Sequence, residues 1–137
     1  MHELKTNNND QNILFFSLLY KYNNHKVGML INDYLTSSIQ TDDRAIHLLF
    51  SANRWEAAPK LVTTLAQGTN VICDRYAYSG VAFTSAKTMD DMCSSSHSGG
   101  GGDITLDWCI GPDIGLPAPD AVIFLDLDQD EAEKRGG

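Results

Sequence analysis

The amino-acid sequence predicts an α/β fold in which a partial parallel sheet is flanked by helices. Two short apolar runs, at residues 70–73 and 121–125, are typical of buried strands. Segments with helical periodicity lie before the first run and after each of them. Apolar strands that alternate with helices indicate a parallel sheet that is covered by helices.

Length and charge limit the classes of protein to consider. A chain of 137 residues with 42% hydrophobic residues fits one domain with a packed core. The formal net charge of -8 argues against a nucleic-acid partner and against an anionic membrane surface, since both require clustered lysine and arginine. The longest markedly apolar run, residues 13–20, is far shorter than the roughly 20 residues that cross a bilayer.

The cysteines bear on the compartment. Cys73, Cys93 and Cys109 are an odd number, and no two of them form a CxxC pair. This pattern favours a reducing setting over a disulfide framework. We therefore expect a cytoplasmic protein, with the nucleus and the organelles left open. No clear cleavage site follows the apolar run, so we do not expect a signal peptide.

Three helices are expected before the first strand. Apolar residues recur at helical spacing over 27–35. A second helix is predicted from about Asp42 to Trp55, where Thr41 provides a cap and acidic residues fill the first turn. A third is predicted from Ala57 to Gln67, with a proline tolerated in its first turn.

The second half of the chain continues the alternation. A short helix follows the strand at 70–73, and a Gly/Ser-rich loop is expected over 88–105, because such a composition buries little apolar surface. A short helix at 106–109, a turn, the strand at 121–125 and a helix at 129–135 complete the order. Asp128 is the expected cap of the last helix.

Asp74 and Arg75 stand at the carboxyl end of the first predicted strand. That edge of an open α/β sheet is where ligands bind. A carboxylate beside a guanidinium suits a magnesium-bound phosphate group, because arginine grips phosphate in bidentate fashion. The structural alternative is a strand-end acid that caps a loop. Asp126 also ends an apolar run, but it lacks an adjacent arginine, and we interpret it as structural.

Three segments in register resemble one family. Residues 74–87, DRYAYSGVAFTSAK, closely resemble the DR[YH] region of thymidylate kinases, which phosphorylate dTMP with ATP. Residues 47–56 are similar to the thymine-binding helix of that family. Residues 106–109 and 112–120 resemble the helix and turn that lead into its next core strand. The resemblance implies a P-loop-kinase-type sheet, incomplete here at both ends.

The resemblance also implies roles for residues near the base. Phe50 would lie beneath thymine, and Arg54, four residues on and on the same helix face, would donate to the base edge. The alternative is that Phe50 is a core residue and Arg54 a solvated charge. Ser79 and Gly80 would let the nucleotide approach closely through small side chains and free amides. Phe83 would form a wall of the pocket, with core packing as the alternative.

For the phosphates, the family pattern places Arg75 on the dTMP phosphate and Asp74 near Mg²⁺, through water and not as a direct metal ligand. Both residues are the expected catalytic residues. Arg135 matches the first arginine of the lid that closes over ATP. Family members are commonly homodimers packed through the helix equivalent to 42–55, which implies the same here.

The resemblance covers about 27–87 and 106–137, so we expect a partial thymidylate kinase-like domain at 27–137, with an insertion at 88–105. Residues 1–26 show no resemblance, and the phosphate-loop motif GxxxxGK[ST] does not occur in the sequence. The expected function is transfer of the γ-phosphoryl group of ATP to dTMP, with Mg²⁺. The alternatives are a catalytically incomplete fragment that binds dTMP or dimerises, and another nucleoside monophosphate or deoxynucleoside kinase.

Overall fold

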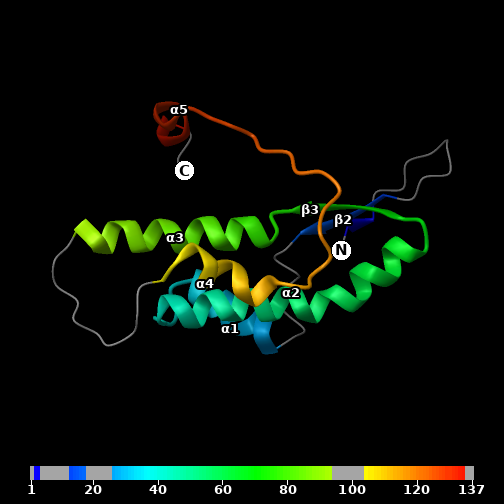
Figure 1. Ribbon diagram of the computed structural model, residues 1–137, viewed down its shortest axis with the longest axis horizontal. Helices are drawn as coiled ribbons and strands as arrows, with labels where there is room; N and C mark the ends of the chain where they lie inside the picture. The colour runs from blue at the N-terminus through cyan, green and yellow to red at the C-terminus, as the bar shows by residue number, and fades with distance from the viewer. Residues whose placement is uncertain (1, 4–12, 18–25, 94–103, 135–137) are drawn as a thin grey trace.

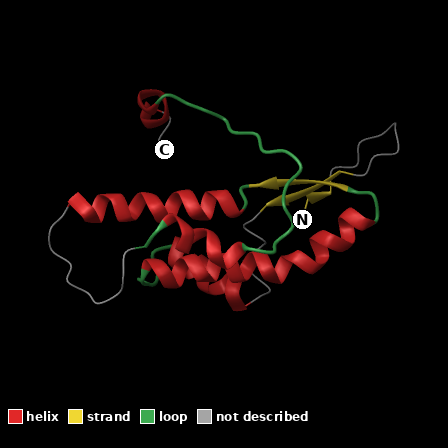
Figure 2. Cartoon of the chain, viewed as in Figure 1, coloured by secondary structure: helices red, strands yellow, loops and turns green. Residues whose placement is uncertain are grey.

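The computed structural model describes residues 2–3, 13–17, 26–93 and 104–134 (Figure 1). Its strands lie at one end of the molecule, and α3 runs on beyond the end of β3 (Figure 2). The elements in chain order are β1 (His2–Glu3), β2 (Ile13–Ser17), α1 (Lys26–Leu35), α2 (Asp43–Ala66), β3 (Asn70–Asp74), α3 (Ala77–Cys93), α4 (Leu106–Ile110), the 3₁₀-helix η1 (Gly111–Asp113) and α5 (Gln129–Lys134).

The sheet has the order β1-β2-β3. β2 and β3 are parallel, with Ile13 opposite Asn70 and Ser17 opposite Asp74, and β1 is antiparallel to β2. The parallel pairing confirms the predicted α/β class. The strand at 13–17 was not predicted, because a single apolar run without a following motif does not distinguish a strand from other buried segments.

Helix α2 is one continuous helix, whereas the sequence analysis predicted two helices with a break near residue 56. Asp42 caps it, since its Oδ1 accepts hydrogen bonds from the N–H groups of Arg44 at 2.9 Å and Ala45 at 3.3 Å. Pro59 lies inside the helix. Proline removes one intrahelical hydrogen bond but does not end this helix, which stops only before Gly68, where φ is +77°.

Helix α3 is longer than predicted. It continues to Cys93 and so includes the first six residues of the predicted loop 88–105. Residues 88–93 contain neither glycine nor proline, so nothing in them opposes the helix that begins at Ala77. The Gly/Ser run, at 94–103, lies outside the described residues.

The predicted strand at 121–125 is wrong. The segment has no regular secondary structure, and the side chains of residues 122–125 are 62% to 87% exposed. In Figure 1 it runs away from β3 toward α5. An apolar run becomes a strand only when another strand supplies its hydrogen bonds. Among the described residues, the sheet ends at β3 and no strand pairs with 121–125.

His47 joins three helices in the interior. It is 1% exposed, and its Nε2 lies 2.9 Å from the carbonyl oxygen of Cys109, while Nδ1 lies 2.8 Å from Thr84 Oγ1. Because a carbonyl only accepts, Nε2 carries the proton and donates. In the neutral ring, Nδ1 then accepts from the Thr84 hydroxyl. The side chain therefore connects α2 to α3 and α4.

We predict that His47→Leu lowers the free energy of unfolding by about 2–4 kcal/mol, because it leaves the Thr84 hydroxyl and the Cys109 carbonyl buried without a partner. Urea denaturation followed by circular dichroism measures this. The matched control on the same helix is Val62→Ala at a side chain that is 51% exposed, where we expect a loss of about 1 kcal/mol or less. Equal losses for the two variants would contradict the assignment.

Candidate functional site

One cavity of about 410 Å³ opens between α1, α2, the end of β3 and α3. Every site residue predicted from the sequence within the described part of the chain lines it. These residues are Phe50, Arg54, Asp74, Arg75, Ser79, Gly80 and Phe83. The other lining residues, Tyr34, Leu35, Ile46, His47, Tyr76, Thr84 and Lys87, were not predicted as site residues. Of these, Tyr76, Thr84 and Lys87 lie inside the DR[YH]-like segment at 74–87, so position in that motif was the available signal.

Arg75 adopts an unusual backbone conformation at the rim of the cavity. Its φ is 63°, in the left-handed region that arginine rarely occupies and that costs about 1 kcal/mol or more. Its guanidinium carbon lies 5.5 Å from the centre of the Phe83 ring. This distance is within the range of a cation–π contact. The turn between β3 and α3 therefore places an exposed cation beside an aromatic ring, next to the carboxylate of Asp74.

Arg54 is buried and ion-paired. Its Nε and Nη2 donate to the two carboxylate oxygens of Asp113, at 2.9 Å and 2.6 Å, and the two side chains are 1% and 6% exposed. The alternative of a solvated helix charge is thus wrong for Arg54. Asp113 lies in η1, 59 residues further along the chain. No spacing in the sequence pointed to this pairing.

Gly80 lies against the guanidinium of Arg54. A Cβ at this position would stand 3.2 Å from Nη1 and 3.3 Å from Nη2. The close approach that the glycine permits is therefore made by a side chain of the protein. Ser79 also differs from expectation, because its backbone N–H already donates to the carbonyl of Tyr76 at 3.0 Å and is not free for a ligand.

The hydroxyl of Tyr76 is buried and has no hydrogen-bond partner among the described residues. Burial is the main cause that raises the pKa of Tyr76, and Cys73 and Asp113 raise it further, while Arg54 lowers it. The phenol is therefore neutral at physiological pH and retains both its donor and its acceptor capacity. Tyr76 lines the cavity, but its hydroxyl oxygen is itself buried, so the ring and not the hydroxyl is its accessible part.

The opposite end of the cavity carries a second ion pair. Lys87 pairs with Asp43 and donates to the hydroxyl of Tyr34 at 2.9 Å. The hydrogen bond to Asp43, followed by that to Tyr34, raises the pKa of Lys87. Lys87 is 41% exposed, so the pair is partly screened by solvent. Lys87 connects α3 to the start of α2 and is already engaged within the protein.

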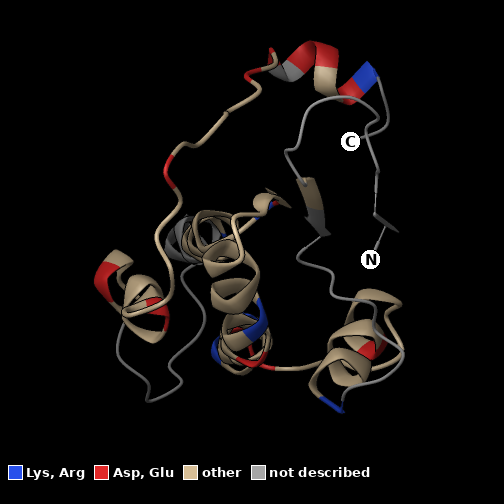
Figure 3. Cartoon of the chain, turned by 90° about the vertical axis from the view of Figure 1, so that its right-hand side faces the viewer, with Lys and Arg blue, Asp and Glu red and all other residues tan. Residues whose placement is uncertain are grey.

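Charge elsewhere in the molecule is mainly acidic. Figure 3 shows acidic residues on α5 and on the segment that leads to it. Within the described ranges, no three His, Cys, Asp or Glu side chains gather where they could hold a metal ion. Among the described residues that line the cavity, Asp74 is the one carboxylate. None of the described helices is both long and apolar enough to cross a bilayer.

Comparison of the sequence and the fold with known proteins shows which family the chain resembles. A sequence model of the thymidylate kinase family matches residues 11–137. The chain is 46% identical over 111 residues to thymidylate kinase of Danio rerio and 45% identical over 111 residues to that of Homo sapiens, covering 81% of this chain and 46% of each relative. The solved structure of thymidylate kinase from Candida albicans superposes with a TM-score of 0.73 at 40% identity, over 91% of this chain and 56% of that one.

The sheet and its cavity thus represent part of a P-loop-kinase-type nucleotide-binding fold. Within that fold, the chain belongs to the thymidylate kinase family. It spans about half the length of the curated relatives it matches. The family match begins at residue 11 and includes β2, so the family extends into the segment 1–26, in which no resemblance was expected.

We predict that Tyr76→Phe leaves the thermal unfolding temperature of the unliganded protein unchanged or higher. The lost hydroxyl has no partner in the described structure, and removing a buried unpaired polar group relieves its desolvation cost. Differential scanning calorimetry at neutral pH measures this. Ser51→Ala is the control, because Ser51 Oγ donates to Asp113 at 2.7 Å, so its loss lowers the temperature. A fall for Tyr76→Phe as large as that for the control would contradict the prediction.

Proposed function

We propose that this chain forms the dTMP site of a thymidylate kinase. In the reaction, the γ-phosphoryl group of ATP passes to the 5′-phosphate of dTMP and yields dTDP. The observation that carries the proposal is that Phe50, Arg54 and Arg75 line one cavity at the carboxyl end of β3. That combination of one aromatic ring and two guanidinium groups suits a pyrimidine monophosphate.

The base would lie at the α2 side of the cavity. Phe50 offers a ring on which a pyrimidine stacks, a contact worth about 1–3 kcal/mol for a base. Arg54 offers Nη1, since its Nε and Nη2 already donate to Asp113. A guanidinium N–H can only donate, and it therefore favours the carbonyl edge of thymine. Phe83 closes the side of the pocket beneath Arg75.

The phosphate would lie at the turn after β3. Arg75 is exposed there and is held near the Phe83 ring, so its N–H groups remain available to phosphate oxygens. Phosphoryl transfer is catalysed mainly by positioning and by neutralising charge. Arg75 supplies both effects at the acceptor phosphate, and it therefore has the catalytic role in this proposal together with Asp74.

The oxygen atoms of the Asp74 carboxylate also suit a Mg²⁺ ion that is held through water. Asp74 presents an exposed carboxylate at the strand end, and no second carboxylate lines the cavity among the described residues. One carboxylate is enough for the water-rich coordination that Mg²⁺ prefers. When bound, the ion neutralises phosphate charge. Asp74 would hold the ion through its bound water.

The donor side of the reaction involves ATP and the lid. Arg135, which matches the first lid arginine, lies outside the described residues, and we propose that it contacts ATP.

The exposed apolar side chains of α2, among them Leu48, Val62 and Leu65, support a homodimer interface on this helix. The free cysteines Cys73 and Cys109 fit a reducing cytoplasm.

The second candidate function is binding of dTMP without catalysis, because the residues that line the cavity suit the acceptor nucleotide. Titration with dTMP and a coupled assay of ADP release separate the two. Saturable dTMP binding with dTMP-dependent ADP release supports the kinase. Saturable binding without release supports the binding fragment. The absence of dTMP binding overturns both.

We predict that Phe50→Ala and Arg75→Ala each weaken dTMP binding about tenfold or more, for different reasons. The first removes the stacking surface, and the second removes a charge-assisted contact to phosphate. Isothermal titration with dTMP and with thymidine separates the two effects. Only Phe50→Ala lowers the affinity for thymidine, which has no phosphate. An equal loss of thymidine affinity in Arg75→Ala would contradict the assignment.

We predict that Gly80→Ala weakens dTMP binding about tenfold while the protein stays folded. The new methyl group meets Nη1 at 3.2 Å, and the buried pair with Asp113 leaves the guanidinium little room to move. Alanine also favours a helix over glycine by about 1 kcal/mol, so the variant does not lose helical stability. Titration with dTMP beside a thermal melt measures both. Gly111→Ala is the control, because nothing lies within 4 Å of its Cβ position.

A further inference from the structure

We propose that Asp113 is a positioning residue that sets base selectivity through Arg54. The inference rests on the proposed function, because it assigns Arg54 to the pyrimidine base. Asp113 does not line the cavity. It therefore acts on a ligand only through the guanidinium that it holds.

The geometry of the pair leaves Arg54 one orientation. Asp113 accepts from Nε and Nη2 in the bidentate arrangement that a carboxylate and a guanidinium share. Rotation of the guanidinium would break one or both of these bonds in a site where the two side chains are 1% and 6% exposed. Nη1 is the remaining nitrogen, and no other hydrogen bond of Arg54 occurs among the described residues. Asp113 thus determines which N–H groups the cavity receives.

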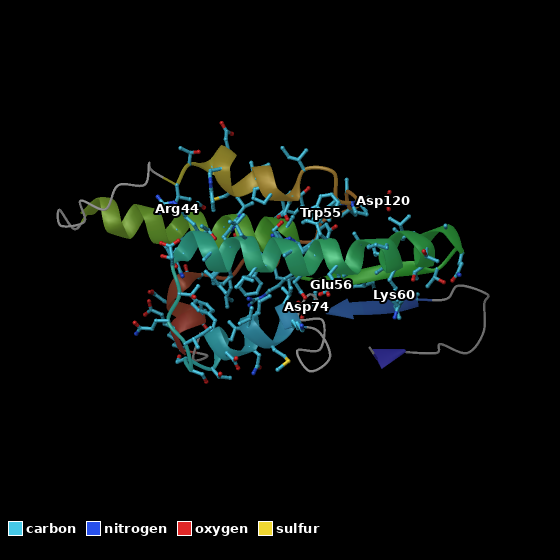
Figure 4. All side chains as sticks on the ribbon, turned by 90° about the horizontal axis from the view of Figure 1, so that it is seen from below. Arg44, Trp55, Glu56, Lys60, Asp74 and Asp120 are labelled. Atoms are coloured by element: carbon cyan, nitrogen blue, oxygen red, sulfur yellow. The ribbon has the colours of Figure 1, made fainter. Side chains whose placement is uncertain are left out.

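Asp113 is in turn fixed to the helix that carries Arg54. Ser51 Oγ donates to Asp113 Oδ1 at 2.7 Å and lies 3.0 Å from the carbonyl oxygen of Pro112. Trp55 Nε1 donates to the same carbonyl at 2.7 Å. Gly115, with φ of 101°, turns the chain where a Cβ would stand 3.2 Å from the Trp55 ring. Figure 4 shows Trp55 on the side of α2 that is nearest to Asp120, in the segment after η1.

Three residues on adjacent turns of α2, Ser51, Arg54 and Trp55, thus contact the η1 turn, and Asp113 in that turn holds the guanidinium. This series of contacts determines which group on the pyrimidine base the site prefers. The N–H groups of Nη1 favour a carbonyl acceptor on the pyrimidine and disfavour an amino group at the same position. A small shift of the guanidinium would lower the preference for the carbonyl without touching the phosphate contact at Arg75.

The test compares three ligands by isothermal titration. dTMP carries a carbonyl where 5-methyl-dCMP carries an amino group, and 2-deoxyribose 5-phosphate lacks the base. Asp113→Asn keeps the shape of the side chain but turns an N–H₂ group toward an arginine donor. We expect the preference for dTMP over 5-methyl-dCMP to fall about tenfold, since a hydrogen bond to a charged group is lost. Affinity for 2-deoxyribose 5-phosphate should stay within about twofold of the wild-type value.

A double-variant cycle shows whether Asp113 acts through Arg54. Arg54→Lys removes the planar guanidinium and should lower the dTMP preference by itself. Adding Asp113→Asn to Arg54→Lys should lower it little further, because the two side chains act as one unit. Additive losses would overturn the proposal. If circular dichroism shows that Asp113→Asn is unfolded, Asp113→Glu, which keeps the negative charge, takes its place. The preference for dTMP over 5-methyl-dCMP is then expected to fall in the same way.

The outcomes separate the inference from the proposed function. A wild-type protein that does not bind dTMP refutes the proposed function. A wild-type protein that prefers dTMP, with folded Asp113 variants that keep the full preference, refutes the positioning role alone. A loss of affinity for all three ligands in the Asp113 variants also refutes it, because that result reports general damage to the cavity.

Discussion

The buried ion pair between Arg54 and Asp113 is the interaction on which the rest of the site depends. An arginine in the middle of α2 cannot be buried without a counter-charge, since removing an ion from water costs several kcal/mol. Asp113 supplies that charge from η1, and the pair therefore fixes the packing of a distant turn against the helix. The pair also bears on Gly80, where a Cβ would stand only 3.2 Å from Nη1 of the guanidinium. One electrostatic constraint thus shapes one wall of the cavity, the helix beside it and the turn behind it.

The opposite wall depends on the backbone. The parallel pairing of β2 with β3 brings Asp74 to the edge of the sheet, and the left-handed conformation at Arg75 turns the chain sharply into α3. Strain of this kind persists where the surrounding structure holds it in place. The cavity is therefore bounded by a charge pair on one side and a strained turn on the other. Phe50 and Phe83 supply the apolar surface between them.

Prediction from the sequence succeeded where the signal was local. The periodicity over 27–35, the acidic start of α2 and the strand before Asp74 all depend on neighbouring residues, and the structure has these elements close to the predicted positions. The site residues were predicted because the amino-acid sequences of 74–87 and 47–56 resemble those of the thymidylate kinase family. The structure gathers those it describes around one cavity.

Interactions between distant residues were not predictable in this way. Nothing in the spacing of His47, Thr84 and Cys109 shows that they meet, and the same holds for Arg54 and Asp113. The errors have the same origin. The run at 121–125 was assigned as a strand from its apolar residues and from the family resemblance of the segment before it, although a strand exists only with a neighbour. The backbone N–H of Ser79 was expected to be free for a ligand, whereas it donates to the carbonyl of Tyr76.

The extended run at 122–125 has a practical consequence for handling the protein. Four consecutive apolar side chains stand in solvent, and the hydrogen-bonding groups along the outer edge of β3 have no neighbouring strand among the described residues. Short, uncharged, β-prone sequences and open sheet edges are the features that template cross-β stacking between copies. We therefore expect this tetrapeptide to promote association between copies in concentrated stocks. Replacing one of these four residues by lysine is the simplest change that should reduce aggregation of the protein.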